Sequence, residues 1–126
     1  MKLTTYEQSL LSGWEEVFKK GQLTLWILLA LKDGPKYMAD IKTFISSATN
    51  GVLSADDVSV YRALRRYVQA ELLVFETVPG KGGPERKVYS LTPTGQKVLQ
   101  AFCTRNIASV FYKPTIQTLI QGTNDV

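Results

Sequence analysis

The 126-residue sequence contains no histidine and a single cysteine, Cys103. Histidine is the commonest general base and metal ligand in proteins, and zinc sites combine several cysteine and histidine side chains. A lone cysteine also cannot close a disulfide within the chain. The sequence also shows no recognisable pair of a nucleophile and a base, and it has no phosphate-binding glycine loop. We therefore predict that the protein is not an enzyme, with no catalytic residue, metal or cofactor.

Long apolar runs are also scarce. The longest, Leu23 to Leu31, is interrupted by Thr24 and is too short to cross a bilayer, so it indicates a buried helix. The N-terminal residues do not show the basic start and apolar core of a secretory signal. We expect a cytoplasmic protein without membrane contact, near the size at which a second subunit often completes the core.

The net charge of +4 is unevenly distributed. Residues 1–61 carry six basic and seven acidic side chains, whereas residues 62–87 carry six basic and three acidic ones. A local basic excess is typical of a surface that faces phosphates, although a solvated basic face without a nucleic-acid role gives the same pattern. The excess indicates where a nucleic acid would bind.

The first half of the chain is predicted to be helical. Apolar residues recur every three or four positions before Gly21, which predicts an amphipathic helix in residues 1–20, and a second helix follows from about Gln22 to Lys32. The third helix is predicted from one apolar face, formed by Tyr37, Ile41, Phe44, Ile45 and Ala48. Ser54 with Asp57 then resembles a capping pair at the start of a fourth helix. We prefer this interpretation to one in which Asp56 and Asp57 are a pair of catalytic carboxylates.

The fourth predicted helix has two different faces. The apolar face, which we expect to pack, consists of Tyr61, Leu64, Val68 and Leu72. The polar and basic face consists of Ser59, Arg62, Arg66 and Gln69, with Arg65 at its border. A helix that packs by one face and leaves a basic face free can enter the major groove of DNA.

The second half begins with two β-prone runs, Leu73 to Val78 and Arg86 to Leu91, joined by a loop rich in glycine and proline. This pattern predicts a hairpin. Thr92 followed by Pro93 then suits the start of a helix, capped by the threonine hydroxyl.

The helix that starts there is predicted to run to about Tyr112 and to show more apolar surface than one terminal helix can hide. Cys103 is expected to pack as a structural thiol within it. Pro114 should end this helix, which leaves residues 114–126 as a short and partly flexible segment.

A basic helix followed by a hairpin and another helix is the outline of a winged helix-turn-helix. Either Arg62 or Arg66 could bind a guanine or grip a phosphate. Alternatives remain for the other positions: a solvated serine at 59, core packing at 61, and a hairpin kept soluble by its charges. The candidate DNA-binding residues are Ser59, Tyr61, Arg62, Arg65, Arg66, Lys81, Arg86 and Lys87.

Three sets of residues between Lys20 and Leu99 follow a known pattern. The first set opens with Gly21 and Leu23 and closes with Gly34 and Pro35, and the second is the Tyr-x-x-Leu of residues 61–64. The third and most specific set consists of Arg86, Lys87, Tyr89, Leu91, Thr92 and Gly95. By these residues the chain resembles the PadR-like family of bacterial transcriptional regulators. The resemblance implies a winged-helix homodimer that usually represses a nearby operon, with its terminal helices swapped against the partner subunit.

The chain departs from the family pattern at several positions. Met38 and Ala39 stand where the family often has Gly-Tyr, Glu71 replaces the usual glycine after the reading helix, and Tyr67 replaces a common leucine. The C-terminal part is also short, without the long coiled coil of larger members. We therefore expect the dimer to rest on the helix before Gly21 and the helix from position 93.

Some members of the family bind planar aromatic molecules between subunits. Trp14 and Trp26 could suggest a site for such a small aromatic effector. Both residues lie on apolar helical faces, however, so we favour a role in core or dimer packing and assign no effector-binding residues.

These observations together predict a mainly α protein with a small β-hairpin. A winged helix-turn-helix in residues 21–92 is flanked by dimerisation helices in residues 1–20 and 93–113 and by the segment 114–126. The predicted function is a sequence-specific DNA-binding transcriptional regulator, a repressor that binds a two-fold related operator on double-stranded DNA as a homodimer. The alternative is a winged-helix protein-interaction module that binds another regulator without reading DNA.

Overall fold

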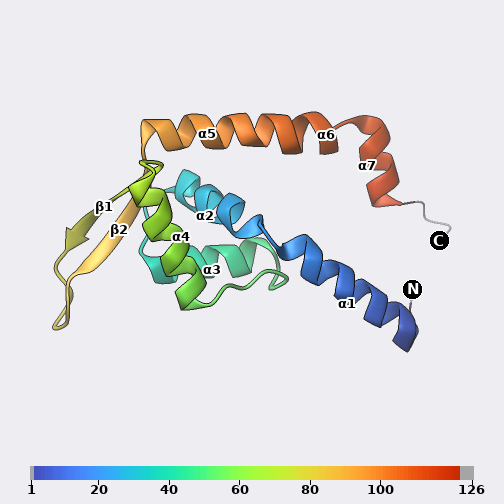
Figure 1. Ribbon diagram of the computed structural model, residues 1–126, viewed down its shortest axis with the longest axis horizontal. Coiled ribbons are helices and arrows are strands. Elements are labelled where there is room, and N and C mark those ends of the chain that lie inside the picture. Colours follow the sequence, from blue (N-terminus) through green and yellow to red (C-terminus); the bar gives the residue numbers. More distant parts are fainter. Residues whose placement is uncertain (1, 123–126) are drawn as a thin grey trace.

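The computed structural model describes residues 2–122. Most of these residues are helical, and an antiparallel hairpin projects from one end of the helical body (Figure 1). This arrangement confirms the predicted mainly α fold with a small hairpin. The elements in chain order are α1 (Thr5–Lys19), α2 (Gln22–Asp33), α3 (Met38–Ala48), α4 (Asp57–Gln69), β1 (Leu73–Val78), β2 (Arg86–Leu91), α5 (Pro93–Cys103), a π-helical turn η1 (Thr104–Ala108), α6 (Ser109–Phe111) and α7 (Pro114–Gln121).

Helix α2 forms the centre of the core, as its nearly continuous apolar sequence predicts. Residues of α3, α4, the hairpin and α5 pack around it, and α2 itself contributes four buried side chains. The buried side chains are Ile27, Leu28, Ala30, Leu31, Ile41, Ile45, Leu53, Val60, Leu64, Leu73, Tyr89 and Leu99. All of these residues lie between positions 27 and 99, so neither α1 nor residues 100–122 contribute a buried side chain to the core of the winged helix-turn-helix.

Helix α4 buries a face that is rotated from the predicted one. Val60 and Leu64 are fully buried, whereas Tyr61 is 45% exposed. The helix also begins later than the predicted Ser54 cap, because Asp56 is the capping residue. The Asp56 carboxylate accepts a hydrogen bond of 2.7 Å from the Ser59 backbone N–H. The rotation matters for function, since it moves Tyr61 from the core to the surface.

The hairpin and its loop, residues 73–91, form the wing. Its strands pair in the predicted positions, from Leu73 opposite Leu91 to Val78 opposite Arg86. The segment before α3 adds one short bridge to β2: the Lys36 N–H donates to the Tyr89 carbonyl at 3.1 Å, and the Tyr89 N–H donates to the Lys36 carbonyl at 2.9 Å. These two bonds join the root of the wing to the helical body.

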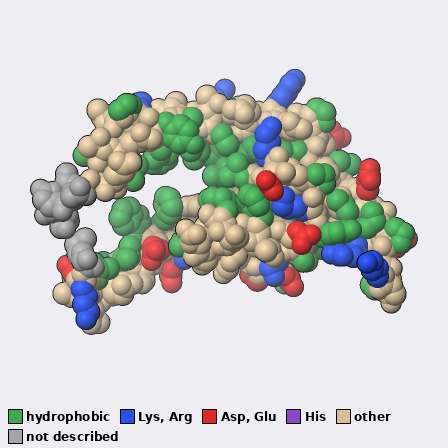
Figure 2. All heavy atoms as spheres, turned by 180° about the vertical axis from the view of Figure 1, so that it is seen from behind, with side chains coloured by type: hydrophobic (Ala, Val, Ile, Leu, Met, Phe, Trp, Pro, Cys, Tyr) green, Lys and Arg blue, Asp and Glu red, His purple; other side chains and the backbone are tan. Residues whose placement is uncertain are grey.

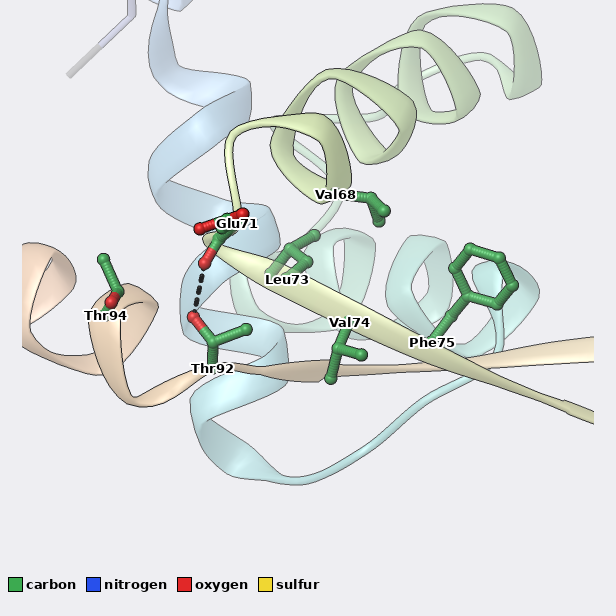
Figure 3. Close-up of a pocket in the computed structure, with 7 residues that line it drawn as sticks. All are labelled: Val68, Glu71, Leu73, Val74, Phe75, Thr92 and Thr94. Carbon is green, nitrogen blue, oxygen red and sulfur yellow. Dashed lines mark hydrogen bonds between the residues drawn. The ribbon is translucent and has the colours of Figure 1, made fainter.

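Thr92 joins the end of the wing to both neighbouring helices. Its hydroxyl donates a hydrogen bond of 2.6 Å to the carbonyl of Glu71, which follows α4 (Figure 3). The same hydroxyl accepts a hydrogen bond of 2.9 Å from the Gly95 N–H at the start of α5. The predicted threonine cap is therefore confirmed. The same side chain also holds the first turn of α5 next to the end of α4.

Helix α1 extends away from the domain as an N-terminal arm (Figure 1). Its start is closed by a capping box in which Thr4 accepts from the Glu7 N–H at 3.1 Å and Glu7 accepts from the Thr4 N–H at 2.8 Å. The bond from the Thr4 backbone lowers the pKa of the Glu7 carboxyl. No residue of α1 is buried, so the described residues leave the apolar face of this helix uncovered.

Helices α5 to α7 form a C-terminal arm that passes over the domain (Figure 1). The predicted single helix to Tyr112 is interrupted by the π-helical turn over Thr104–Ala108, in which backbone hydrogen bonds span five residues, so that one turn holds an extra residue. The helical run ends at Phe111, before Pro114, as expected, and Pro114 itself begins α7, with its fixed φ at the first helical position. Of the segment expected to be flexible, residues 123–126 lie outside the described residues.

Candidate nucleic-acid interface

The start of α4 places Ser59 in the first helical turn. Its hydroxyl donates a hydrogen bond of 3.1 Å to the second carboxylate oxygen of Asp56, so the side chain takes part in capping while remaining exposed. The bond from the Ser59 backbone, followed by that from its hydroxyl, lowers the pKa of the Asp56 carboxyl. Ser59 can therefore reach a ligand only if its hydroxyl reorients from this bond.

Three arginines lie exposed along the outer side of α4: Arg62, Arg65 and Arg66. Ion pairs in residues 2–122 join Lys36 to Asp33, at 2.8 Å, and Lys42 to Asp57, and neither involves these arginines. A guanidinium without a carboxylate partner presents all five of its donors to an incoming anion. This row of cations can therefore bind phosphates or the acceptor edge of guanine.

A hollow of about 350 Å³ separates the wing from the start of α3. It brings together three of the predicted residues, Tyr61 from α4 with Arg86 and Lys87 from β2. Tyr89, which also lines it, is 5% exposed. Burial, with a smaller effect of Tyr61, raises the pKa of the Tyr89 hydroxyl, so this group stays protonated at neutral pH and can act as a donor.

The three cations of the wing have different surroundings. Lys81 lies exposed in the loop at the tip. The Lys87 ammonium lies 4.5 Å from the centroid of the Phe75 ring, within the hairpin itself. The Arg86 guanidinium carbon lies 3.6 Å from the centroid of the Tyr37 ring, outside the hairpin. The sequence prediction grouped these cations together, whereas only Arg86 among them is stacked on an aromatic ring of the helical body.

Tyr37 is the residue of this region that the sequence analysis did not recognise. It was assigned to the packing face of the third helix, but it is the N-cap residue of α3 and is only half-buried. Its contact with Arg86 joins residues far apart in the sequence. The available signal was an aromatic residue directly before a helix start, which is too general to indicate this contact.

The chain is similar to known transcriptional regulators. The transcriptional regulator PadR-like family matches residues 27–101, which is most of the winged domain. The chain belongs to the PadR-like family. None of the curated proteins compared with it is a significant match.

Solved structures of PadR-like proteins have the same fold. A PadR-like transcription factor from Bacteroides fragilis is 30% identical, with a TM-score of 0.62 over 74% of this chain and 87% of that one. A PadR-like regulator from Bacillus cereus is 25% identical, with a TM-score of 0.64 over 82% of this chain and 96% of that one. PadR from Bacillus subtilis, solved in complex with operator DNA, is 25% identical, with a TM-score of 0.59 over 64% of this chain and 45% of that one.

PadR-like proteins are transcriptional regulators, and the described part of this chain contains no cluster of three or more side chains suited to a metal ion. Within residues 2–122, every helix is too short or too polar to serve as a membrane span.

Proposed function

We propose that this PadR-like regulator binds double-stranded DNA in a sequence-specific manner, with α4 in the major groove and the wing along the neighbouring backbone. The observation that carries the proposal is the row of arginines on α4, which have no carboxylate partner within residues 2–122, beside a basic wing. An α-helix fits the major groove, where flanking cations bind phosphates. The operator complex of the related Bacillus subtilis protein supports the same use of the fold here.

The interface in this proposal consists of the residues predicted from the sequence. On α4 these are Ser59, Tyr61, Arg62, Arg65 and Arg66, and on the wing Lys81, Arg86 and Lys87. The arginines supply the charge, while Tyr61 borders the hollow between α4 and the wing. The wing residues contribute to DNA binding through their charge and also because the position of the hairpin decides which phosphates they can reach.

The proposed regulator acts as a homodimer. Large apolar side chains are exposed along both arms, among them Trp14 at 72% and Leu119 at 76%. Figure 2 shows hydrophobic side chains gathered along the inner sides of the two arms, next to the space between them. Apolar surface of this extent is typical of a protein interface, and a second copy of the chain offers a matching surface by symmetry.

A two-fold dimer presents two α4 helices to DNA. We propose that it binds a two-fold related operator with half-sites about one helical turn apart, and that in the cytoplasm it represses transcription by occupying this site. Trp14 has its role in the dimer contact, and Trp26, half-buried in α2, has a packing role. No aromatic effector is assigned to either residue.

Fluorescence anisotropy tests the proposal. The full chain is titrated into a labelled duplex carrying the region upstream of its own gene and, in parallel, into a shuffled duplex, each over a series of salt concentrations. Expected are preference for the upstream duplex and a steep loss of affinity with salt, because each phosphate contact contributes about 0.9 to the slope of log K against log salt. Failure to bind either duplex at low salt would favour the protein-interaction module, and equal binding to both would remove sequence specificity from the proposal.

A further inference from the structure

Arg86 stacks on a ring that belongs to the helical body. Its guanidinium carbon lies 3.6 Å from the centroid of the Tyr37 ring. Arg86 is the first residue of β2, and Tyr37 is the N-cap residue of α3. A planar guanidinium can lie flat on an aromatic face and gains both dispersion and cation–π attraction there, which the compact ammonium of lysine reproduces poorly.

The stack adds an attachment point to the wing nearer its tip. The root of the wing is held by the pair of backbone hydrogen bonds between Lys36 and Tyr89, at 3.1 and 2.9 Å, and by the burial of Leu73 and Tyr89 in the core. Arg86 lies three residues closer to the tip than Tyr89, a separation of about 10 Å along an extended strand. Contacts at the root alone leave the outer part of a hairpin free to bend, whereas an added contact at this separation restrains its direction.

Few other contacts could replace the stack. It stands between two hollows, of about 350 and 430 Å³, both of which are lined by Tyr37, Glu85 and Arg86. The Lys87 ammonium contacts Phe75 of the same hairpin and so does not join the wing to the body. The direction of the loop that carries Lys81 therefore depends on Arg86.

We infer that Arg86 is a positioning residue: through Tyr37 it holds the wing at the angle at which Lys81 meets the DNA backbone. This inference rests on the proposed function, since it concerns how the same DNA surface is arranged. It differs from the sequence prediction, which treated Arg86 as a direct DNA contact. It also gives Tyr37, which carries no charge, a measurable part in DNA binding.

A double-mutant cycle tests the inference with the duplex that the wild-type protein prefers. Tyr37→Leu and Arg86→Ala are each expected to weaken binding by about two- to fivefold, the effect of an exposed cation–π contact. The double variant should bind no more weakly than either single variant, because both remove one contact. Tyr37→Phe keeps the ring and should restore wild-type affinity.

The salt dependence separates positioning from direct contact. Tyr37→Leu changes no charge, so a decrease of its salt slope by about 0.9 or more would show that the wing cations have withdrawn from phosphates. Lys81→Ala should lower the slope to the same extent, with no further decrease when combined with Tyr37→Leu. Wild-type binding by Tyr37→Leu, additive losses in the cycle, or loss of affinity in Tyr37→Phe would each overturn the inference.

A measurement without DNA keeps this inference distinct from the proposed function. In the NMR spectrum of the free protein, the Arg86 δ-methylene protons should be shifted upfield by the Tyr37 ring, and Tyr37→Leu should abolish the shift while the melting temperature shows that the domain remains folded. Absence of the shift in the wild type would overturn the stack itself. A normal shift in a protein that binds no DNA would instead overturn the proposed function.

Discussion

Gly95, in the first turn of α5, lies directly against the backbone carbonyl of Leu72, which follows α4. A Cβ atom at position 95 would overlap with this oxygen. The Leu72 carbonyl also accepts hydrogen bonds from the Thr92 N–H and, at 3.1 Å, from the Thr92 hydroxyl. It is therefore held in place and cannot move aside at low cost. The close approach explains why the sequence has glycine in the first turn of a helix.

The first prediction follows from this contact. Gly95→Ala should destabilise the protein by about 1–3 kcal/mol, the usual cost of forcing an extra group into a packed region. Gly13→Ala is the matched control, because the same change in α1 meets no atom within 4 Å and should stabilise the helix by about 0.5–1 kcal/mol. Urea denaturation of the three proteins measures both effects. Equal stability of the Gly95→Ala variant and the wild type would contradict the close contact.

The second prediction concerns Glu71, which has a φ of 64°. Its N–H donates to the Val68 carbonyl and the Leu72 N–H to the Tyr67 carbonyl, the two hydrogen bonds of a Schellman motif at the end of α4. The position after the C-cap in this motif is usually glycine, because a Cβ is strained in the left-handed region. Glu71 therefore carries a backbone strain that a glycine at this position would not have.

Glu71→Gly is therefore expected to raise the free energy of unfolding by up to about 1 kcal/mol. Glu71→Ala keeps the strained φ but removes the carboxylate, so it separates the effect of conformation from that of charge. Thermal and urea unfolding should show stabilisation by glycine but not by alanine. Similar gains in both variants would attribute the effect to charge.

The elements themselves could be predicted where local sequence decides them. The apolar run of α2, the two strands of the wing and the Thr92 cap of α5 are each determined by neighbouring residues, and the structure places them as expected. Side-chain roles on α4 were harder, because Val60 and Tyr61 are both apolar. A helix can bury either one by a rotation of about 100°. Only packing against α2 and α3 selects Val60.

Other features depend on contacts that no local pattern encodes. Both Ser54 and Asp56 are good capping residues, and the path of the preceding loop determines that Asp56 takes this place. The contact of Tyr37 with Arg86 exists because β2 returns to the start of α3. For this reason the sequence could name candidate basic residues on α4 and the wing, but it could not predict the different surroundings of Lys81, Arg86 and Lys87.

The third prediction uses the cap at Asp56, whose pKa is lowered by the hydrogen bond from the Ser59 backbone. A carboxyl with a lower pKa in the folded state stabilises the fold above its unfolded pKa, near 3.9, and this contribution is lost as the pH falls through the folded value. Asp56→Asn keeps a capping oxygen without the titration. The stability advantage of the wild type over Asp56→Asn should therefore be largest near neutral pH and shrink on acidification. Urea denaturation over a pH series checks this, and a constant difference would exclude the charged cap.

The fourth prediction tests the proposed dimer surface at Trp14, which is 72% exposed in the protomer. Trp14→Glu should weaken dimerisation by about 2 kcal/mol or more, the effect of removing a central aromatic residue from an interface. Ser12→Glu adds the same charge to α1 away from its apolar stripe and should leave the dimer intact. Analytical ultracentrifugation over a concentration series measures both. A monomeric wild-type protein, or dissociation by both variants, would contradict this assignment.

The fifth prediction distinguishes the roles of Arg62 and Arg66 on α4. If one of them binds a guanine through two of its guanidinium N–H groups, its replacement by alanine should cost about 1–3 kcal/mol and relax the base preference at a single operator position. If it grips a phosphate, the same replacement should weaken binding to all duplexes alike and lower the salt slope by about 0.9.

Arg105→Ala provides the control for loss of a positive charge, because this exposed arginine belongs to η1 of the C-terminal arm and not to α4 or the wing. Anisotropy titrations against the preferred duplex, a set of single-base variants and a shuffled duplex separate these outcomes. Since both arginines lack a carboxylate partner in residues 2–122, their replacement leaves no buried charge behind, and a loss of affinity with normal thermal stability reports a DNA contact. Unchanged binding by both variants would mean that α4 is not the reading helix, and the proposed orientation on DNA would then be wrong.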